Sequence, residues 1–268
     1  MRLPPAELAE LEAMRSLFAW WPQAHVAELG GATCTALETV PRSAMFNRAL
    51  GLGLAEPATD EGLDAIAAFF RRHGVSYAVA LAPGAEPGDL PERLERHGLA
   101  RGHAWQKFTR DTGLAPDVSS ELRVERVGPE RAAAFADAFT RAYGTPRVVQ
   151  PLLERLPGLR GWHCFVAFAG DAPAATGALY VTADIGWLGI AGTLPELRGR
   201  GAQSAIIAAR IETARASGCT IVVTETGVPV DGDAGPSYRN LVRAGFEPAY
   251  VRENYLSSAD ADTSGTLA

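Results

Sequence analysis

One stretch of the chain, residues 189–217, constrains the fold more than any other. It begins in an apolar strand, turns through Arg198-Gly199-Arg200-Gly201, and continues as a helix whose apolar residues repeat with a period of 3.6. A glycine-rich turn that opens a helix is an anion site, because unpaired backbone N–H groups and the positive end of the helix dipole face the same small volume. The two arginines add charges that pair with phosphate. The stretch therefore predicts a phosphate-binding loop between a strand and a helix.

The composition is that of an ordinary globular protein. Of the 268 residues, 47% are hydrophobic and 21% are charged, which allows one large domain or two smaller ones. The net charge of −6 argues against a nucleic-acid partner, which needs a basic surface. Because no apolar run reaches the roughly 18 residues of a membrane span and no secretion signal is visible, we expect no membrane partner. Cys34, Cys164 and Cys219 form no C-x-x-C pair, so we expect free, buried thiols in a cytoplasmic protein.

The order of the predicted elements is that of an α/β protein, with mixed central sheets flanked by helices. In the first half, we predict helices over 6–20, 62–73 and 90–97, and strands over 44–50, 77–82 and 104–110, with one or two more between 26 and 40. In the second half, we predict helices over 130–143, 148–156 and 237–243 besides the one after Gly201, and strands over 122–127, 163–169, 174–182, 185–193, 220–226 and 248–255.

The two halves of the chain end alike, which favours an internal duplication. Each runs from a glycine through an apolar strand, a Pro/Gly loop, a short helix and a second glycine to a final strand. Gly74 matches Gly218 at an offset of 218 − 74 = 144, and Gly98 matches Gly245 at 245 − 98 = 147. The alternative is that any two α/β segments look alike. The duplication predicts a first domain over 1–112, a polar linker over 113–120, a second domain over 121–256 and a flexible tail over 257–268.

The first half lacks the features that make the second half an anion site. Its glycine loop after residue 50 contains no arginine, and the helix that follows begins with Thr59 as an N-cap and then Asp60 and Glu61. Carboxylates in the first turn of a helix occupy the positive end of the dipole themselves and repel a phosphate. We therefore expect one phosphate site in the chain, in the second half.

The glycine-arginine loop resembles motif A of the GNAT N-acetyltransferases, which reads arginine or glutamine, two residues, glycine, one residue, and glycine or alanine. Arg198 and Gly201 match this pattern, whereas Gln203 departs from it at the last position. Downstream, Gly245-Phe246 after a helix is similar to the end of motif B. The resemblance implies two tandem GNAT-like acyl-CoA N-acyltransferase domains, of which the first is a degenerate copy.

The resemblance implies acetyl-CoA, or another acyl-CoA, as cosubstrate, and no metal. Backbone N–H groups of the loop would hold the pyrophosphate, and the preceding strand would diverge from its neighbour at a bulge, for which Gly186, Gly189 and Gly192 are suited. Ordinary tight packing is the alternative explanation of these three glycines. The predicted cofactor-binding residues are Ala191, Gly192, Thr193, Arg198, Gly199, Arg200, Gly201, Ala202, Gln203, Ser204 and Asn240.

Acyl transfer to an amine needs a base for the amine and an acid for the leaving thiolate. The family often places a tyrosine four residues before the glycine of motif B, where this chain has Leu241. Tyr238, three residues earlier on the same helix face, is the predicted acid, and Glu225 at the end of a strand is the predicted base. A half-buried helix tyrosine and a surface glutamate are the structural alternatives. His163 is another candidate base, and a packed histidine is its alternative.

These features predict an N-acetyltransferase that transfers an acetyl group from acetyl-CoA directly to an amine of a small-molecule or peptide acceptor. The alternatives are a catalytically silent acyl-CoA-binding sensor or assembly module, and a homodimer built through the first half. We expect the substitution Gly201→Glu to abolish CoA binding and to leave the fold intact.

Overall fold

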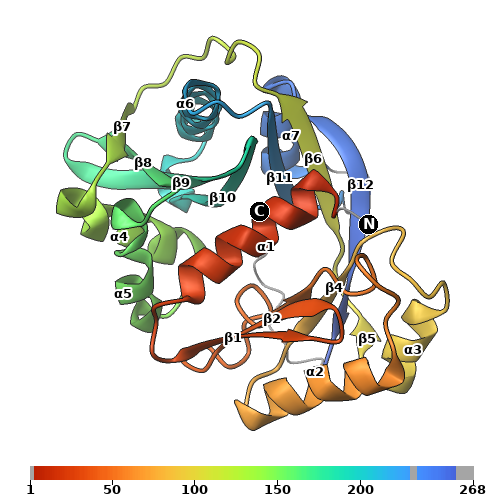
Figure 1. Cartoon of the computed structure of the whole chain (residues 1–268). Helices are drawn as coiled ribbons and strands as arrows, with labels where there is room; N and C mark the ends of the chain where they lie inside the picture. Colours follow the sequence, from red (N-terminus) through yellow and green to blue (C-terminus); the bar gives the residue numbers. More distant parts are fainter. Residues whose placement is uncertain (1–2, 230–233, 258–268) are drawn as a thin grey trace. The chain divides into compact units, whose positions relative to one another are not determined.

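The computed structural model describes residues 3–229 and 234–257, and the chain divides into two compact units (Figure 1). Among the described residues, unit 1 contains residues up to Lys107 and those from Tyr250 on, and unit 2 contains those from Phe108 to Ala249. The flexible tail that the sequence predicts lies, after Ser257, outside the described residues. Of the helices described, none has both the length and the apolar character needed to cross a bilayer.

Unit 1 consists of a mixed sheet and its flanking helices. The strands of the sheet follow the order β1-β2-β3-β4-β12. Its strands are β1 (Ala24–Leu29), β2 (Ala32–Leu37), β3 (Arg48–Leu50), β4 (Ala78–Leu81), β5 (Ala100–Arg101) and β12 (Glu247–Leu256), which enters this unit at Tyr250. Its helices are α1 (Pro5–Phe18), α2 (Asp60–Arg72) and α3 (Leu90–Arg96). The β1-β2 and β2-β3 pairs are antiparallel, and β3 pairs with β4 in parallel because α2 carries the chain back between them. Short β5 pairs with β12.

The predicted N-cap of α2 is confirmed. The hydroxyl of Thr59 accepts a hydrogen bond from the N–H of Gly62 at 3.1 Å. The helix then buries Leu63, Ile66 and Phe70 at helical spacing in the core of unit 1. Helix α2 is therefore fixed at its start by a side-chain cap and along its length by an apolar face.

Helix α1 buries two carboxylates among its apolar residues, which the sequence analysis does not predict. Glu10 accepts hydrogen bonds from Arg48 at 2.7 Å, from Lys107 at 2.5 Å and from Arg252 at 2.5 Å. Glu7 also pairs with Arg252, at 3.1 Å. Burial alone would raise the pKa of Glu10, but the charges of Arg252, Lys107 and Arg48 together hold it well below its ordinary value. Unit 1 thus contains an ionised carboxylate surrounded by three cations in its interior.

Unit 2 is a second mixed sheet, in the strand order β6-β11-β10-β9-β8-β7. Its strands are β6 (Trp105–Asp111), which enters this unit at Phe108, and β7 (Arg123–Val127), β8 (Trp162–Ala169), β9 (Ala172–Thr182), β10 (Ile185–Thr193) and β11 (Ile221–Gly227). Its α-helices are α4 (Ala132–Tyr143), α5 (Gln150–Leu153), α6 (Ala202–Ala216) and α7 (Gly235–Arg243), and its 3-10 helices are η1 (Pro129–Arg131), η2 (Arg147–Val149), η3 (Leu156–Gly158) and η4 (Pro195–Leu197). Helices α4 and α6 cover opposite faces of the sheet (Figure 1).

The two units share an order of elements. In each, three antiparallel strands lead to a helix and then to a strand parallel to the third: β1-β2-β3, α2 and β4 in unit 1, and β8-β9-β10, α6 and β11 in unit 2. This common order agrees with the predicted elements and with the α/β fold class.

The boundaries between the units differ from those that the sequence repeat suggests. The sheet of unit 1 continues from β4 into β12, from the end of the chain, and the sheet of unit 2 continues from β11 into β6, from the end of the first half. Residues 250–256, predicted to lie in the second domain, therefore belong to unit 1, and residues 108–112 belong to unit 2. Strand pairing, which a repeat in the sequence does not reveal, decides the division.

Candidate functional site

Strands β10 and β11 of unit 2 pair only at their beginnings. Their register runs from Ile185 to Trp187, and the hydroxyl of Thr224 then donates to the carbonyl of Leu188 at 2.8 Å. Among the described residues, no register pair joins the two strands beyond Trp187, although β10 continues for six more residues, to Thr193. The far half of β10 is therefore free of a strand partner on its β11 side.

A bulge lies in the same half of β10, as predicted from its glycines. Gly189 faces Ala178 of β9, whereas Gly192 faces Thr176, so β10 contains one extra residue between them. Within this bulge Ile190 has a φ of 48°, a left-handed conformation that is strained for a β-branched residue. Such strain persists only where the surroundings fix the backbone, and it is concentrated at functional sites.

The glycines around the bulge also allow tight packing, so both explanations given for them hold. A Cβ on Gly189 would lie 1.9 Å from the indole ring of Trp187, which folds across it. A Cβ on Gly192 would lie 2.8 Å from the ring of Tyr143 and from Ala142 on α4. No larger residue fits at either position without moving the strand or the helix.

Arg210 of α6 supports the bulge from the opposite face. Its guanidinium, 3% exposed, donates to the carbonyl of Ala178 at 3.1 Å and to that of Gly189 at 3.5 Å. Within the described ranges no carboxylate pairs with it, and burial lowers the pKa of Arg210 to about 9. Sequence analysis missed this residue, although its position four residues after buried Ile206 and four before buried Ala214 places it on the inner face of the helix.

The N-terminus of α6 leaves its backbone N–H groups unpaired. Gly201 is the N-cap with a φ of 78°, and no side chain caps the helix. The first hydrogen bond runs from the N–H of Ala205 to the carbonyl of Gly201 at 3.0 Å. In the part of the chain that the structure describes, the N–H groups of residues 199–204 donate to no acceptor. They provide the anion-binding arrangement expected from the sequence.

The two arginines of the loop differ in their surroundings. Arg198 is exposed, and its side chain makes no hydrogen bond or ion pair among the described residues. Arg200 instead donates from Nε to Glu121 at 2.8 Å, and its carbonyl accepts from the N–H of Glu121 at 3.3 Å. Arg200 therefore attaches the loop to the segment before β7, and Arg198 is the arginine with a free charge.

Gln203, the departure from motif A, turns toward the sheet. Its side-chain amide donates to the hydroxyl of Thr193 on β10 at 3.0 Å. It therefore does not fill the space in front of the unpaired N–H groups. The hydrogen bond also connects the first turn of α6 to the end of the bulged strand, which fixes two predicted cofactor-binding residues relative to each other.

The expectation that Gly201→Glu leaves the fold intact is wrong. A Cβ on Gly201 would lie 2.5 Å from the backbone carbonyl oxygen of Ser119 and 3.2 Å from the Cα of Ser120. The positive φ of Gly201 adds strain to any other residue there. This substitution would change the loop itself, so it does not separate binding from folding.

The carbonyl of Ala191, one of the predicted cofactor-binding residues, already has a partner. The hydroxyl of Tyr143, on α4, donates to it in a short hydrogen bond. Burial raises the pKa of Tyr143, although the charges of Arg210 and Arg198 oppose the shift, so the phenol stays protonated as a donor. Sequence analysis missed Tyr143 because its helix lies about fifty residues before the strand that it contacts.

The predicted acid, Tyr238, is half-buried on α7, a helix that contacts both α6 and β11. Its ring packs edge-on against Phe108 with centroids 4.9 Å apart. Its hydroxyl has no hydrogen-bond partner within residues 3–229 and 234–257. Asn240, on the same helix, accepts a hydrogen bond from Arg243 at 2.5 Å through its amide oxygen. Tyr238 is thus packed as a half-buried helix tyrosine, and its hydroxyl makes no hydrogen bond to the described residues.

The two candidate bases lie in different strands. Glu225 is half-buried on β11, two residues beyond the last register pair with β10. His163 lies on β8. Strand β9 lies between β8 and β10, so at the usual strand spacing β8 is about 10 Å from β10. Burial and the charge of Arg126 lower the pKa of His163, and its Nδ1 is buried without a partner. These surroundings are those of a packed histidine.

Residues 132–241 match the acetyltransferase (GNAT) family. The matched segment contains β10, the glycine-arginine loop, α6, β11 and most of α7. The predicted cofactor-binding residues and both predicted catalytic residues all lie inside this GNAT segment. A search of curated proteins found no match to the chain.

Solved structures with the same fold cover nearly the whole chain. A GCN5-related N-acetyltransferase from Kribbella flavida is 20% identical, with a TM-score of 0.66 over 94% of this chain and 95% of that one. One from Sphaerobacter thermophilus is 14% identical, with a TM-score of 0.59 over 94% and 91%. A tandem GNAT protein from the clavulanic acid biosynthesis pathway, solved without AcCoA, is 16% identical, with a TM-score of 0.57 over 94% of both chains. The fold class predicted from the sequence is therefore confirmed.

Proposed function

We propose that unit 2 binds acetyl-CoA, or a related acyl-CoA, and transfers the acyl group to an amine. The observation that carries this proposal is the open N-terminus of α6, where the N–H groups of residues 199–204 are unpaired beside the exposed Arg198. This anion site lies in the segment that matches the GNAT family and directly follows the bulged, partly unpaired strand β10. Structural relatives that are named acetyltransferases add support at the level of the fold.

The residues of the loop fit a diphosphate. The unpaired N–H groups and the positive end of the α6 dipole stabilise negative charge, Arg198 adds a full positive charge, and Ser204 adds a hydroxyl in the first helical turn. Thr193, held by Gln203, lies at the end of the strand along which an extended pantetheine arm would run. Tyr143 and Arg210 act as positioning residues that hold the bulge in its strained form.

The chemistry requires that a C–N bond forms, a C–S bond breaks, a proton leaves the amine and a proton reaches the sulfur. A thioester supplies the activated acyl carbon for this exchange. We assign the removal of the amine proton to Glu225, through a water molecule, since its side chain lies beyond the last paired residue of β11. We assign protonation of the sulfur to Tyr238, whose hydroxyl has no other partner in the described chain.

Unit 1 is proposed to be a degenerate copy that binds no acyl-CoA. Unit 1 repeats the element order of unit 2, and one structural relative of the whole chain is described as a tandem GNAT protein. The corresponding loop of unit 1 is packed, with Leu52 and Leu54 buried. A cytoplasmic location is supported by Cys34, Cys164 and Cys219, which are all free and buried.

Calorimetric titration with acetyl-CoA tests the proposed site. We expect one site per chain, and we expect Arg198→Gln to weaken binding about tenfold, which is about 1.4 kcal/mol. Arg200→Gln is the matched control, since that arginine is paired with Glu121, and it should weaken binding much less. Equal losses in the two variants would contradict the assignment of the free charge to Arg198.

Release of CoA thiol in the presence of a panel of amines tests the transfer step. Tight binding of acetyl-CoA without thiol release for any amine would favour the alternative, a sensor or assembly module. Release that depends on both Glu225 and Tyr238 would support the roles given to them.

A further inference from the structure

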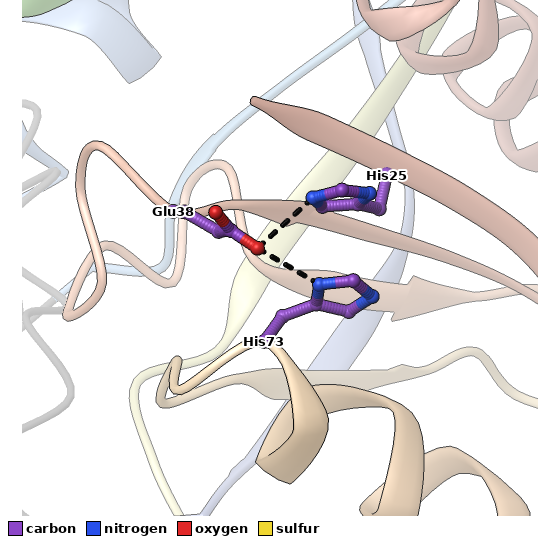
Figure 2. Close-up of side chains that lie close together, drawn as sticks. All are labelled: His25, Glu38 and His73. Carbon is purple, nitrogen blue, oxygen red and sulfur yellow. Dashed lines mark hydrogen bonds and ion pairs between the residues drawn. The ribbon is translucent and has the colours of Figure 1, made fainter. Parts of the chain in front are cut away.

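Two histidines and a glutamate from separate elements of unit 1 converge on one point (Figure 2). His25 lies in β1, Glu38 directly follows β2, and His73 is the C-cap of α2. One oxygen of Glu38 lies 3.0 Å from Nε2 of His25 and 2.9 Å from Nδ1 of His73. All three ligand atoms lie within 4.8 Å of one another. In the sequence analysis the GNAT resemblance implies no metal, and residues 25, 38 and 73, which are far apart in the chain, form no local motif that would indicate one.

We propose that His25, Glu38 and His73 bind a divalent cation of the zinc class, which joins α2 to the β1-β2 hairpin. Two imidazole nitrogens and one carboxylate oxygen are a donor set that suits Zn²⁺ and its transition-metal neighbours, whereas Mg²⁺ and Ca²⁺ prefer oxygen donors alone. Three protein ligands leave a fourth tetrahedral position for water. Glu38 is 44% exposed, so the site is open to solvent on that side.

The two separations between the carboxylate oxygen and the ring nitrogens are near those of a tetrahedral site, and the two nitrogens lie within 4.8 Å of each other. With Zn–N and Zn–O bonds of about 2.0–2.1 Å, neighbouring ligand atoms lie about 3.3 Å apart. The two N–O separations, 3.0 and 2.9 Å, need to open by only a few tenths of an ångström. A cation placed among the three atoms would replace the two hydrogen bonds that the histidines now make to Glu38.

The stacking of the two rings determines what must move. The rings of His25 and His73 lie 3.8 Å apart, centre to centre, at 18° to each other. The lone pair of a ring nitrogen lies in the plane of its ring, and the two stacked planes are nearly parallel, so one ring must turn about its Cβ–Cγ bond for both nitrogens to face one ion. His73, 14% exposed, is packed against Phe69 with ring centres 4.9 Å apart, whereas His25 is 33% exposed, so His25 is the ring with more solvent around it to turn into.

The proton balance requires only a change of tautomer. In the hydrogen-bonded form, each neutral histidine donates the N–H that faces Glu38, so the proton sits on Nε2 of His25 and on Nδ1 of His73. Binding a cation requires those nitrogens to be bare, and each neutral ring achieves this by moving its proton to the other nitrogen. The carbonyl groups at the C-terminus of α2 add a favourable negative field around His73.

Titration of the untagged, chelator-treated chain with Zn²⁺, and with Co²⁺ as a spectroscopic probe, tests this site. We expect one-to-one binding, a tetrahedral Co²⁺ absorption spectrum, and a Tm that rises with Zn²⁺ but not with Mg²⁺. Glu38→Gln should weaken Zn²⁺ binding at least tenfold, and His73→Ala at least a hundredfold. Circular dichroism of Glu38→Gln, whose exposed side chain can change without loss of core packing, verifies that the variant is folded.

His97→Ala is the matched control. His97 pairs with a carboxylate in the same unit, Asp64 at 3.6 Å, but no second histidine joins that pair among the described residues. Its loss should leave Zn²⁺ affinity unchanged. The proposal is overturned if the unaltered chain shows no one-to-one Zn²⁺ binding, or if binding survives both Glu38→Gln and His73→Ala.

Discussion

Helices α2 and α6 occupy the same place in the two units, each between the third strand and the strand parallel to it, but their N-termini are opposite in character. In α2 the hydroxyl of Thr59 takes up an N–H group, and Asp60 and Glu61 place negative charge in the first turn. In α6 the cap is Gly201, the first turn has no acidic residue, and no side chain occupies the free N–H groups. The same position in the fold is therefore capped by the chain's own side chains in unit 1 and left open, as the proposed anion site requires, in unit 2.

The loops that lead into these helices show the same contrast. In unit 1, the backbone of Gly53 packs so closely that a Cβ there would lie 2.6 Å from the carbonyl oxygen of Glu86, and the N–H of Glu86 donates to Gly53 at 2.9 Å. In unit 2, a Cβ on Gly199 would meet no atom within 4 Å. A loop whose polar backbone groups are satisfied by its own chain has nothing left for a ligand, which is why element order alone does not transfer function from one unit to the other.

Buried charge differs between the units as well. Unit 1 surrounds the carboxylate of Glu10 with Arg48, Lys107 and Arg252, so that its interior charges are paired. Unit 2 buries Arg210 against backbone carbonyls alone. Paired buried charges neutralise each other, whereas a buried cation whose hydrogen bonds go only to backbone carbonyls is costly, and the strain beside it at Ile190 is of a kind concentrated at functional sites.

The largest effect that we expect is on the stability of unit 1. Glu10→Ala leaves three buried cations without their shared carboxylate and should lower the free energy of unfolding by about 3–5 kcal/mol. Denaturant unfolding measures this loss. Glu12→Ala is the matched control, because Glu12 lies on the same helix but pairs with Arg15 at the surface, and its loss should cost less than about 1 kcal/mol.

Glu10 also predicts how the free energy of unfolding changes with pH. The folded pKa of Glu10 is depressed below its unfolded value, so the stability it contributes is present above about pH 4.3 and is lost as the pH falls toward the folded pKa. The unaltered chain should therefore lose more stability on acidification than Glu10→Ala does. Identical acid profiles for the two proteins would show that the cluster does not hold an ionised Glu10.

The next prediction concerns a substitution that places an acidic residue in the first turn of α6, as in α2. Gln203→Glu keeps the shape of the side chain, and the new carboxylate can accept from the hydroxyl of Thr193, so the fold should be retained. Its charge lies beside the free N–H groups, where it should weaken acetyl-CoA binding about tenfold or more by occupying the dipole and repelling phosphate. Calorimetry on the two proteins at one salt concentration measures the change.

Ala216→Glu is the matched control for net charge. It adds the same carboxylate at an exposed position of the same helix, about 20 Å from Gln203 at 1.5 Å per residue. A similar loss of affinity in both variants would mean that total charge, rather than the N-terminus of α6, controls binding.

Local pattern was sufficient for most of the fold. Apolar periodicity and turn residues predicted nearly every helix and strand, and Thr59, Gly74 and Pro129 mark ends that the structure places within a residue or two. The uncapped start of α6 at Gly201 was also readable, because a glycine-rich turn into a helix is built from consecutive residues. These features share one property, which is that all their contacts lie close in sequence.

Contacts between distant segments were not readable. The chain contains one lysine, and nothing in its sequence neighbourhood indicates that Lys107 lies buried against Glu10. Tyr143 reaches Ala191 only because α4 packs on β10. The last strand of each half pairs in the sheet of the other unit. The hydrophobic pattern does not predict this exchange, since β6 and β12 are both alternating strands that follow a glycine.

The smallest effect that we expect comes from removing the cap at the N-terminus of α2. Thr59→Ala removes the cap of α2 and should lower the free energy of unfolding by about 1 kcal/mol, because the N–H of Gly62 loses its acceptor. Acetyl-CoA affinity should not change, since the N-terminus of α2 keeps Asp60 and Glu61 in its first turn. Thermal unfolding and calorimetry on the same preparation measure both quantities. A second acetyl-CoA site in this variant would mean that the cap, and not the two carboxylates, closes unit 1 to anions.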